Sequence, residues 1–296
     1  MILVAGSANL DFVVRAPHIP AAGETILGST FMTYPGGKGA NQAIACARAG
    51  GSDTAMLLAL GDDVHGVPIE ASLRTAGVRM HIVRVADRAT GTAFICVADD
   101  AQNAITVTPG ANYSLDAQHL PPLDGVTHLL MQLEIPLSTV VAYATAAKSR
   151  GVKVVLNAAP AQSLPAELLA LLDVLIVNEG ELAAITGCGA DIEQGLQRLA
   201  VPCVIVTLGE RGCLARSERQ FISQKGFRVA PVDTTAAGDT FCGVLTAGLD
   251  RGLDLSEALR NACAAGALAC TKAGAQSSIP SGEEVRAFLR SGDASR

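Results

Sequence analysis

The segment Asp233-Thr234-Thr235-Ala236-Ala237-Gly238-Asp239-Thr240-Phe241 is the part of the sequence around which the rest is interpreted. Its small residues predict a tight turn with uncovered backbone amides, followed by a helix. The first helical turn has N–H groups without intrahelical partners, and the helix dipole favours an anion there. Asp239 would place a proton-accepting carboxylate beside those amides, as phosphoryl transfer to a hydroxyl requires. Taken alone, a helix-capping role for Asp239 explains the pattern equally well.

The composition indicates a folded α/β protein and excludes several function classes. The chain has 296 residues, of which 49% are hydrophobic and 17% charged, so it can bury a large core. Its net charge of −6 and few aromatic residues argue against nucleic-acid binding. The sequence has no apolar run of membrane-spanning length and no signal-peptide pattern, which predicts a protein without membrane contact. Eight cysteines without a C-x-x-C pair are typical of a reducing cytoplasm, where we expect the protein.

From residue 126 onward, apolar strands alternate regularly with helices. Strands are predicted at 126–133, 152–157, 173–177 and 202–207, and helices at 137–149, 165–171, 180–186 and 191–200. This alternation predicts a mostly parallel, doubly wound sheet with helices on both faces. Polar residues close these strands, where ligands collect in such sheets: Glu134, Asn157, Asn178 and Thr207.

Two strand-rich stretches interrupt the alternation. Residues 12–35 and 80–108 contain short predicted strands separated by turns. We expect them to pair into a small separate sheet, so that residues 1–296 form one domain with a strand-built insertion.

A second small-residue motif, Gly36-Gly37-Lys38-Gly39-Ala40-Asn41-Gln42, precedes a predicted helix that runs to Ala49. It lacks the spacing and the Ser/Thr of a Walker A loop. The glycines allow close backbone approach, and Lys38 and Asn41 supply hydrogen-bond donors. By itself such a loop is a weak signal.

The two motifs together, in this order, resemble the N-terminal and C-terminal signatures of the ribokinase-like (PfkB) sugar kinases. The similarity covers nearly the whole chain. It implies a three-layer α/β/α sandwich with a β-sheet lid, and a homodimer formed through that lid. It also implies ATP-dependent phosphorylation of a sugar, with D-ribose at its 5-hydroxyl as the first choice, and with Mg²⁺ and an activating K⁺ as cofactors.

The resemblance implies a role for each matching residue. Asp239 would be the general base, and the backbone of Ala236, Ala237, Gly238 and Asp239 the anion hole. The sugar-binding positions would be Asn9, Asp11, Gly37, Lys38, Asn41 and Glu134. Asn178 and Glu181 would organise Mg²⁺ and the phosphates, and the nucleotide would contact Thr207, Gly209, Gly212, Gly238 and Asn261. The K⁺ loop would contain Asp233, Thr235, Ala269, Lys272, Gly274 and Ser278.

Several alternatives stay open at the level of sequence. Asn178 and Glu181 also fit a helix capping box, and Glu134 and Asp233 could be ordinary strand-end and turn residues. The polar pocket favours a free pentose over a nucleoside, whose base needs an apolar slot, but a related sugar or a nucleoside remains the second choice. A sugar-binding regulator without catalysis is a more remote alternative, disfavoured by Asp239 and Gly238. Two departures from the family pattern, Ala236 and Cys242, are expected to leave the chemistry intact.

Overall fold

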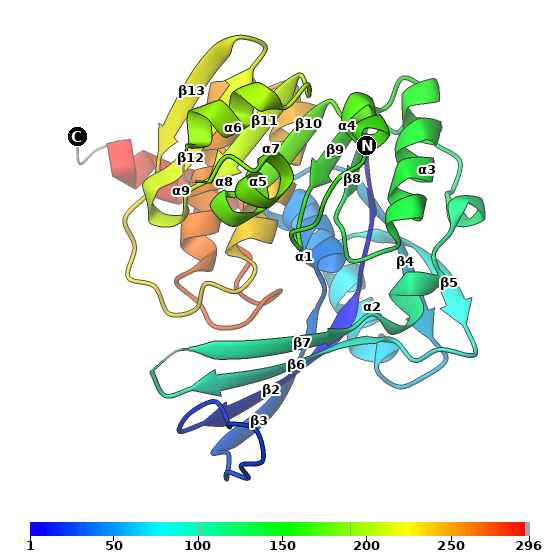
Figure 1. Ribbon diagram of the computed structural model, residues 1–296, viewed down its shortest axis with the longest axis vertical. Helices are drawn as coiled ribbons and strands as arrows, with labels where there is room; N and C mark the ends of the chain where they lie inside the picture. Colours follow the sequence, from blue (N-terminus) through cyan, green and yellow to red (C-terminus); the bar gives the residue numbers. More distant parts are fainter. Residues whose placement is uncertain (101, 190, 294–296) are drawn as a thin grey trace.

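The computed structural model describes residues 1–100, 102–189 and 191–293, and these residues form two sheets (Figure 1). The larger sheet has nine strands within these ranges, in the order β13-β12-β11-β10-β9-β8-β1-β4-β5. The strands from β11 to β5 run parallel, whereas β12 and β13 are antiparallel. Their bounds are β1 (Ile2–Ala5), β4 (Thr54–Gly61), β5 (Arg79–Val85), β8 (His128–Met131), β9 (Lys153–Asn157), β10 (Val174–Asn178), β11 (Cys203–Thr207), β12 (Gly212–Ser217) and β13 (Gln220–Lys225).

Helices cover both faces of this sheet, and successive residues of each buried strand point to opposite faces. Ile2 and Val4 of β1 pack in one core, and Leu3 and Ala5 pack in the other. The first core contains residues from α1 (Lys38–Ile44), α2 (Gly66–Thr75), α7 (Ala237–Asp250), α8 (Leu255–Ala269) and α9 (Gly282–Asp293). The second contains residues from α3 (Leu137–Ser149), α4 (Ala166–Leu171), α5 (Glu179–Thr186) and α6 (Ile192–Arg198). The predicted three-layer, doubly wound fold is confirmed.

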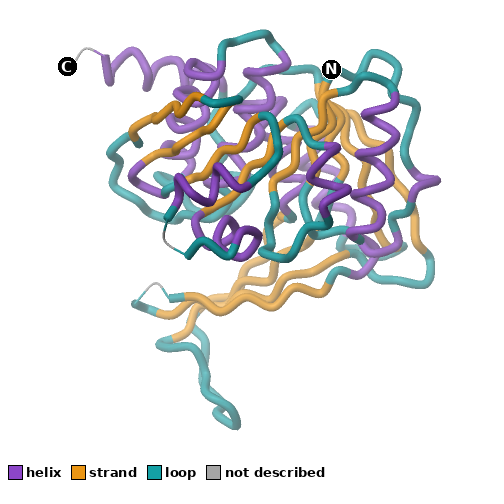
Figure 2. Tube along the Cα trace, turned by 45° about the horizontal axis from the view of Figure 1, so that its top comes forward, coloured by secondary structure: helices purple, strands orange, loops and turns teal. Residues whose placement is uncertain are grey.

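The smaller sheet projects from one end of this body and forms the lid (Figures 1 and 2). In the described residues it has four strands, ordered β3-β2-β6-β7. They are β2 (Asn9–Ala16), β3 (Thr30–Gly36), β6 (Gly91–Ala98) and β7 (Asn103–Thr108).

The expected lid range of 80–108 is wrong at its start. β5 pairs in parallel with β4 as the edge strand of the main sheet, and the lid begins only at Gly91. An edge strand and a lid strand have the same half-buried composition, so local pattern does not distinguish them. Asn9 and Asp11, which follow β1 in the chain, lie at the start of the first lid strand, β2.

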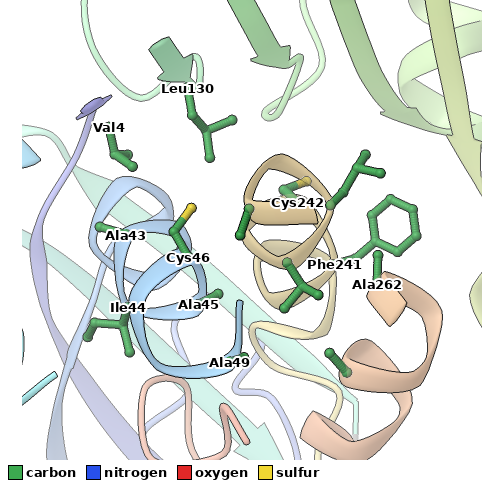
Figure 3. Packing of buried hydrophobic residues seen from close by; sticks show 14 of the residues in the cluster. Val4, Ala43, Ile44, Ala45, Cys46, Ala49, Leu130, Phe241, Cys242 and Ala262 are labelled. Carbon is green, nitrogen blue, oxygen red and sulfur yellow. The ribbon is translucent and has the colours of Figure 1, made fainter. Parts of the chain in front are cut away.

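Helix α1, extended by the π-helical turn η1 (Ala45–Ala49), packs against α7 in the middle of the molecule (Figure 3). A Cβ on Gly243 would lie 2.5 Å from the Ala45 Cβ and 2.6 Å from the Gln42 carbonyl oxygen. The glycine therefore permits an approach that any side chain would prevent. This close packing brings the side chains at the start of α1 to the start of α7.

No helix in the described ranges combines the length and apolar character needed to cross a lipid bilayer.

Candidate active site

Asp239 is held by two side-chain amides from α1. Asn41 Nδ2 donates to Asp239 Oδ2 at 2.9 Å, and Gln42 Nε2 donates to Asp239 Oδ1 at 2.9 Å. The Asp239 side chain is 9% exposed, so both of its oxygens are oriented by protein donors with little access for competing water. The two small-residue motifs, almost 200 positions apart in the chain, thus form one site.

Glu134 is bound into the glycine-rich loop. Its Oε2 accepts from Ser7 Oγ at 2.5 Å and from the Lys38 backbone amide at 3.1 Å. Ser7 Oγ also accepts from the Gly39 amide at 3.3 Å. These bonds rule out the interpretation of Glu134 as a solvated strand-end charge.

Asn9 and Asp11 lie on lid strand β2, where Asn9 pairs with Gly36 at the start of the same loop. Asn9 Oδ1 accepts from Asn112 Nδ2 at 2.8 Å, and both side chains are buried. A Cβ on Gly91 would lie 2.2 Å from Asn112 Nδ2 and 2.3 Å from Asn9 Oδ1, so this pair requires a glycine beside it. The Thr90–Ala93 and Pro109–Asn112 stretches therefore support the site through packing.

The charges around Asp11 form one electrostatic group. Burial raises the pKa of Asp11 to about 7, helped by the negative charges of Glu134 and Asp239 and opposed by Lys38. The charge of Asp239 in turn raises the pKa of Lys38, against the opposing effect of burial. Lys38 is the cation of this group of carboxylates, and a polyhydroxylated ligand could bond to both kinds of charge.

The start of α7 borders a large cavity. Ala236, which precedes the helix, has φ 59°, the left-handed conformation, and no described side chain caps this end. The Ala237 amide donates to the Thr234 carbonyl at 3.3 Å, whereas the amides of Gly238 and Asp239 in the same turn are available to an anion. A cavity of ≈ 850 Å³ is lined there by Ala237 and Gly238 of α7, and by Thr207, Gly209 and Gly212, which span the connection from β11 to β12.

This cavity has the size of a small-molecule binding site. Its wall also includes Arg211, Phe227, Arg228, Cys263 and Gly266. Cavities of this volume hold drug-sized ligands, with apolar walls and a few polar groups. Asn261 lies on α8 two residues before Cys263 and does not line the cavity itself.

Asn178 and Glu181 form a reciprocal capping box at the start of α5, as the structural alternative predicted. Asn178 Oδ1 accepts from the Glu181 amide, and Glu181 Oε2 accepts from the Asn178 amide, both at 2.8 Å. Burial raises the pKa of Glu181, outweighing the Asn178 hydrogen bond and the charge of Lys38, and the charge of Asp239 raises it further. Glu181 is thus a buried carboxylate within electrostatic range of the Asp239 group.

Asp233 joins two loops behind α7. Its Oδ1 accepts from the Thr235 amide at 2.9 Å and the Thr235 hydroxyl at 2.6 Å, and its Oδ2 accepts from the Gly274 amide at 2.9 Å. Burial raises the pKa of Asp233, but the bonds from Thr235 and Gly274 outweigh it, and the net shift is downward. The carboxylate is therefore ionised at neutral pH.

Three other residues predicted for the K⁺ loop, Ala269, Lys272 and Ser278, form hydrogen bonds that do not involve Asp233. The Ala269 carbonyl accepts from the Lys272 amide at 3.3 Å, whereas Lys272 Nζ reaches Glu284 of α9 at 2.7 Å. Ser278 Oγ donates to the Ala275 carbonyl at 2.8 Å. No group of three or more His, Cys, Asp or Glu side chains suited to a metal occurs among the described residues.

Sequence reasoning named Gln42 and Asn157 but missed Gln132 and the bonds that join these residues beneath Asp239. All three are buried, and Gln132 and Asn157 are each hydrogen-bonded to Gln42. Their residue type could have indicated this group, because a Gln or Asn side chain in an apolar strand or on the buried face of a helix needs a hydrogen-bond partner. Ser7 and Asn112, which support Glu134 and Asn9, were also missed as site residues.

The chain is similar in sequence and in fold to known proteins. Residues 1–282 match the family described as pfkB family carbohydrate kinase. A ribokinase of Haemophilus influenzae is 40% identical over 300 residues, covering 97% of this chain and 98% of its own. A deoxyribokinase of Salmonella typhi is 32% identical, covering 97% and 98%. The solved structure of Arabidopsis thaliana ribokinase complexed with ribose and ATP superposes with a TM-score of 0.90, at 34% identity and 98% coverage of each chain.

Proposed function

Because the chain belongs to the pfkB family of carbohydrate kinases, we propose that it transfers the γ-phosphoryl group of ATP to the 5-hydroxyl of D-ribose. The products are ribose 5-phosphate and ADP. The observation that carries the proposal is the bond between Asn41 and Asp239, which joins the glycine-rich loop to the acid at the start of α7. This arrangement brings a group of polar side chains close to a carboxylate at an uncapped helix start.

Asp239 is the general base in this proposal. Its oriented carboxylate accepts the proton of the sugar hydroxyl as the new P–O bond forms and the bond to ADP breaks. The transition state of phosphoryl transfer is loose, so the proton leaves late and a strongly basic group is unnecessary. Amides of Ala236, Ala237, Gly238 and Asp239 hold the transferring group as the anion hole.

The sugar hydroxyls bind to Asn9, Asp11, Gly37, Lys38, Asn41 and Glu134. The burial of Asn9, Asp11 and Asn41 supports a polar ligand, because buried polar groups require partners once water is excluded. The adjoining cavity, with Thr207, Gly209 and Gly212 in its wall, supports the nucleotide site, and Asn261 would approach the base from α8.

Asn178 and Glu181 would hold a hydrated Mg²⁺ with the phosphates of ATP. Mg²⁺ keeps several waters and needs only one or two carboxylates, which fits a single buried Glu beside an amide oxygen. Bound there, the ion would neutralise phosphate charge, which Lys38 alone cannot do.

A K⁺ ion would bind between the 233–235 and 269–278 loops. Asp233 is ionised and ties the two loops together, and the backbone carbonyls around Ala269, Lys272, Gly274 and Ser278 are oxygen ligands of the kind that alkali ions prefer. A cation there would stiffen the turn that carries the anion hole.

A homodimer formed through the lid is part of the proposal, as is a cytoplasmic location. Large apolar side chains of the lid are exposed: Phe31 by 62%, Met32 by 52%, Phe94 by 54% and Ile105 by 55%. Exposed apolar patches of this kind mark interaction surfaces, and a second lid offers a matching surface.

A coupled assay of ADP formation tests the proposal with ribose, deoxyribose, fructose, fructose 6-phosphate, adenosine and pseudouridine as acceptors. We expect the highest kcat/KM with ribose. Asp239→Asn should fold and bind ATP but lose about 100-fold or more in kcat, the range for a positioned base. Near-normal turnover by that variant contradicts the role of Asp239.

Deoxyribose is the second candidate substrate, because a deoxyribokinase is among the similar proteins. If deoxyribose gives the higher kcat/KM, the substrate assignment changes but the mechanism does not. Turnover with none of the acceptors would favour a sugar-binding protein without catalysis.

A further inference from the structure

We propose that Gln42 is a positioning residue that orients the Asp239 carboxylate through a chain of buried amides. The inference rests on the proposed role of Asp239 as the proton acceptor. Gln42 has 0% exposure, so it cannot touch a sugar or a nucleotide, and any effect it has on catalysis must pass through a neighbour.

The Gln42 amide is fixed at three points. Its Nε2 donates to Asp239 Oδ1 at 2.9 Å and to Asn157 Oδ1 at 3.0 Å, and its Oε1 accepts from Gln132 Nε2 at 2.6 Å. The carboxylate is an acceptor, so the NH₂ end of Gln42 must face Asp239, and this defines the orientation of the whole amide.

The chain continues into the rigid parallel sheet. Gln132 directly follows β8, and Asn157 ends β9, where its Nδ2 donates to the Ile176 carbonyl of β10 at 3.3 Å. A Cβ on Gly6 would lie 2.0 Å from Gln132 Oε1, so glycine at this position leaves the space that the Gln132 amide occupies. The carboxylate is therefore anchored to three adjacent strands and not only to its own helix.

Asn41 and Gln42 each bind one oxygen of the Asp239 carboxylate, but their roles differ. Asn41 binds Oδ2 and is also a proposed sugar ligand, so its amide has two tasks, whereas Gln42 binds only protein groups. With Gln42 in place, rotation of the carboxylate about its side-chain bonds breaks a buried hydrogen bond. Misplacement of a reacting group by about 1 Å can cost about 100-fold in rate, which sets the scale of the expected effect.

The test compares Gln42→Met and Gln42→Glu with the parent enzyme, in the ADP-formation assay. We expect Q42M, which keeps the volume but removes the donor, to lower kcat by about 10- to 100-fold while the KM for ATP changes less than about threefold. In Q42E the introduced carboxyl repels Asp239 when ionised and can donate a hydrogen bond when protonated. The ratio of variant to parent kcat should therefore recover as the pH is lowered from about 9 to about 6.

A matched control is Thr246→Val, which removes another fully buried polar group from α7. The Thr246 hydroxyl donates to the Cys242 carbonyl and has no contact with Asp239. Its kcat should stay within about twofold of the parent. Thermal denaturation of every variant confirms that the folded enzyme is compared.

A double substitution separates positioning from a general structural effect. If Gln42 acts through Asp239, Q42M should cause no further loss of kcat in an Asp239→Asn background. A further loss of about 10-fold in that background overturns the inference, and so does a Q42M enzyme with kcat within twofold of the parent.

An NMR measurement tests the contact between the Gln42 amide and the Asp239 carboxylate without relying on turnover. In ¹⁵N-labelled protein, the Gln42 side-chain amide signals, assigned by their loss in Q42M and Q42E, should move when Asp239 is replaced by Asn. Unmoved signals overturn the inference. A parent enzyme that phosphorylates none of the acceptors refutes the proposed function, and this measurement then still shows whether Gln42 holds the carboxylate.

Discussion

The replacement of Asp11 by Asn should make the protein more stable, and increasingly so as the pH rises. Asp11 is 8% exposed, and its burial, together with the charges of Glu134 and Asp239, raises its pKa from 3.8 to about 7. The folded state thus binds the proton more tightly than the unfolded state. The contribution of Asp11 to stability is fully present below pH 3.8 and is lost as the pH rises towards 7.

The magnitude follows from the two pKa values. A difference of about 3 pH units corresponds to about 4 kcal/mol at pH values above 7. Relative to low pH, ionisation of Asp11 lowers the free energy of unfolding by about 1.7 kcal/mol at pH 5 and by about 4 kcal/mol at pH 8. Asn stays neutral throughout, so the free-energy difference between Asp11→Asn and the parent should grow by roughly 2 to 3 kcal/mol between these two pH values.

The assay is urea denaturation of both proteins at several pH values, with the free energy of unfolding obtained by linear extrapolation. Asp62→Asn is the matched control, because it removes the same charge from an exposed loop side chain. For this control, the difference from the parent should change by less than about 0.5 kcal/mol over the same range.

A constant difference between Asp11→Asn and the parent would refute the reasoning, because it would mean that Asp11 is already ionised in the folded protein at pH 5. That result would show that Lys38 offsets the effects of burial and of the neighbouring carboxylates.

Three further predictions concern the sugar site, the cation and the lid. In Gly36→Ala the new Cβ would lie 2.1 Å from Asp11 Oδ2, so we expect the KM for ribose to rise at least about 10-fold with little change in the KM for ATP; an unchanged ribose KM counts against Asp11 as a ligand. Activity measured in K⁺ should exceed activity in Na⁺ at equal ionic strength, and equal rates would contradict the proposed cation loop. Phe94→Asp, at a 54% exposed lid position, should convert a dimer to monomers in sedimentation experiments, whereas an unaffected dimer excludes this surface.

Much of the fold could be predicted from local pattern. The alternation of apolar strands and helices after residue 126 predicted the parallel sheet, and α3 spans the predicted residues 137–149. The periodicity of side chains records which face of an element is buried, but it does not record which strand lies beside it. Local pattern therefore predicts that the lid begins at residue 80, whereas β5 (Arg79–Val85) pairs with β4 in the main sheet.

The sequence predicted those parts of the site that depend on the backbone of a single motif. Small residues before Asp239 and the glycines at 36–39 indicated uncovered amides and close backbone approach, and the structure joins the two motifs through Asn41. The alternatives at Glu134 and at Asn178 depended on contacts that a sequence does not contain. The structure resolves the first in favour of a half-buried, hydrogen-bonded carboxylate and shows that the second is also a capping box.

The sequence by itself determined the fold class, the carboxylate at the start of α7 and the polar residues available for a sugar. Only the tertiary structure decided how these groups are held. The amides of Gln42, Gln132 and Asn157 come from a helix and from the ends of two strands, and they meet only when α1, α7 and the sheet pack together. Hydrogen bonds between residues so far apart in the chain depend on three-dimensional packing, and no local propensity or spacing encodes them.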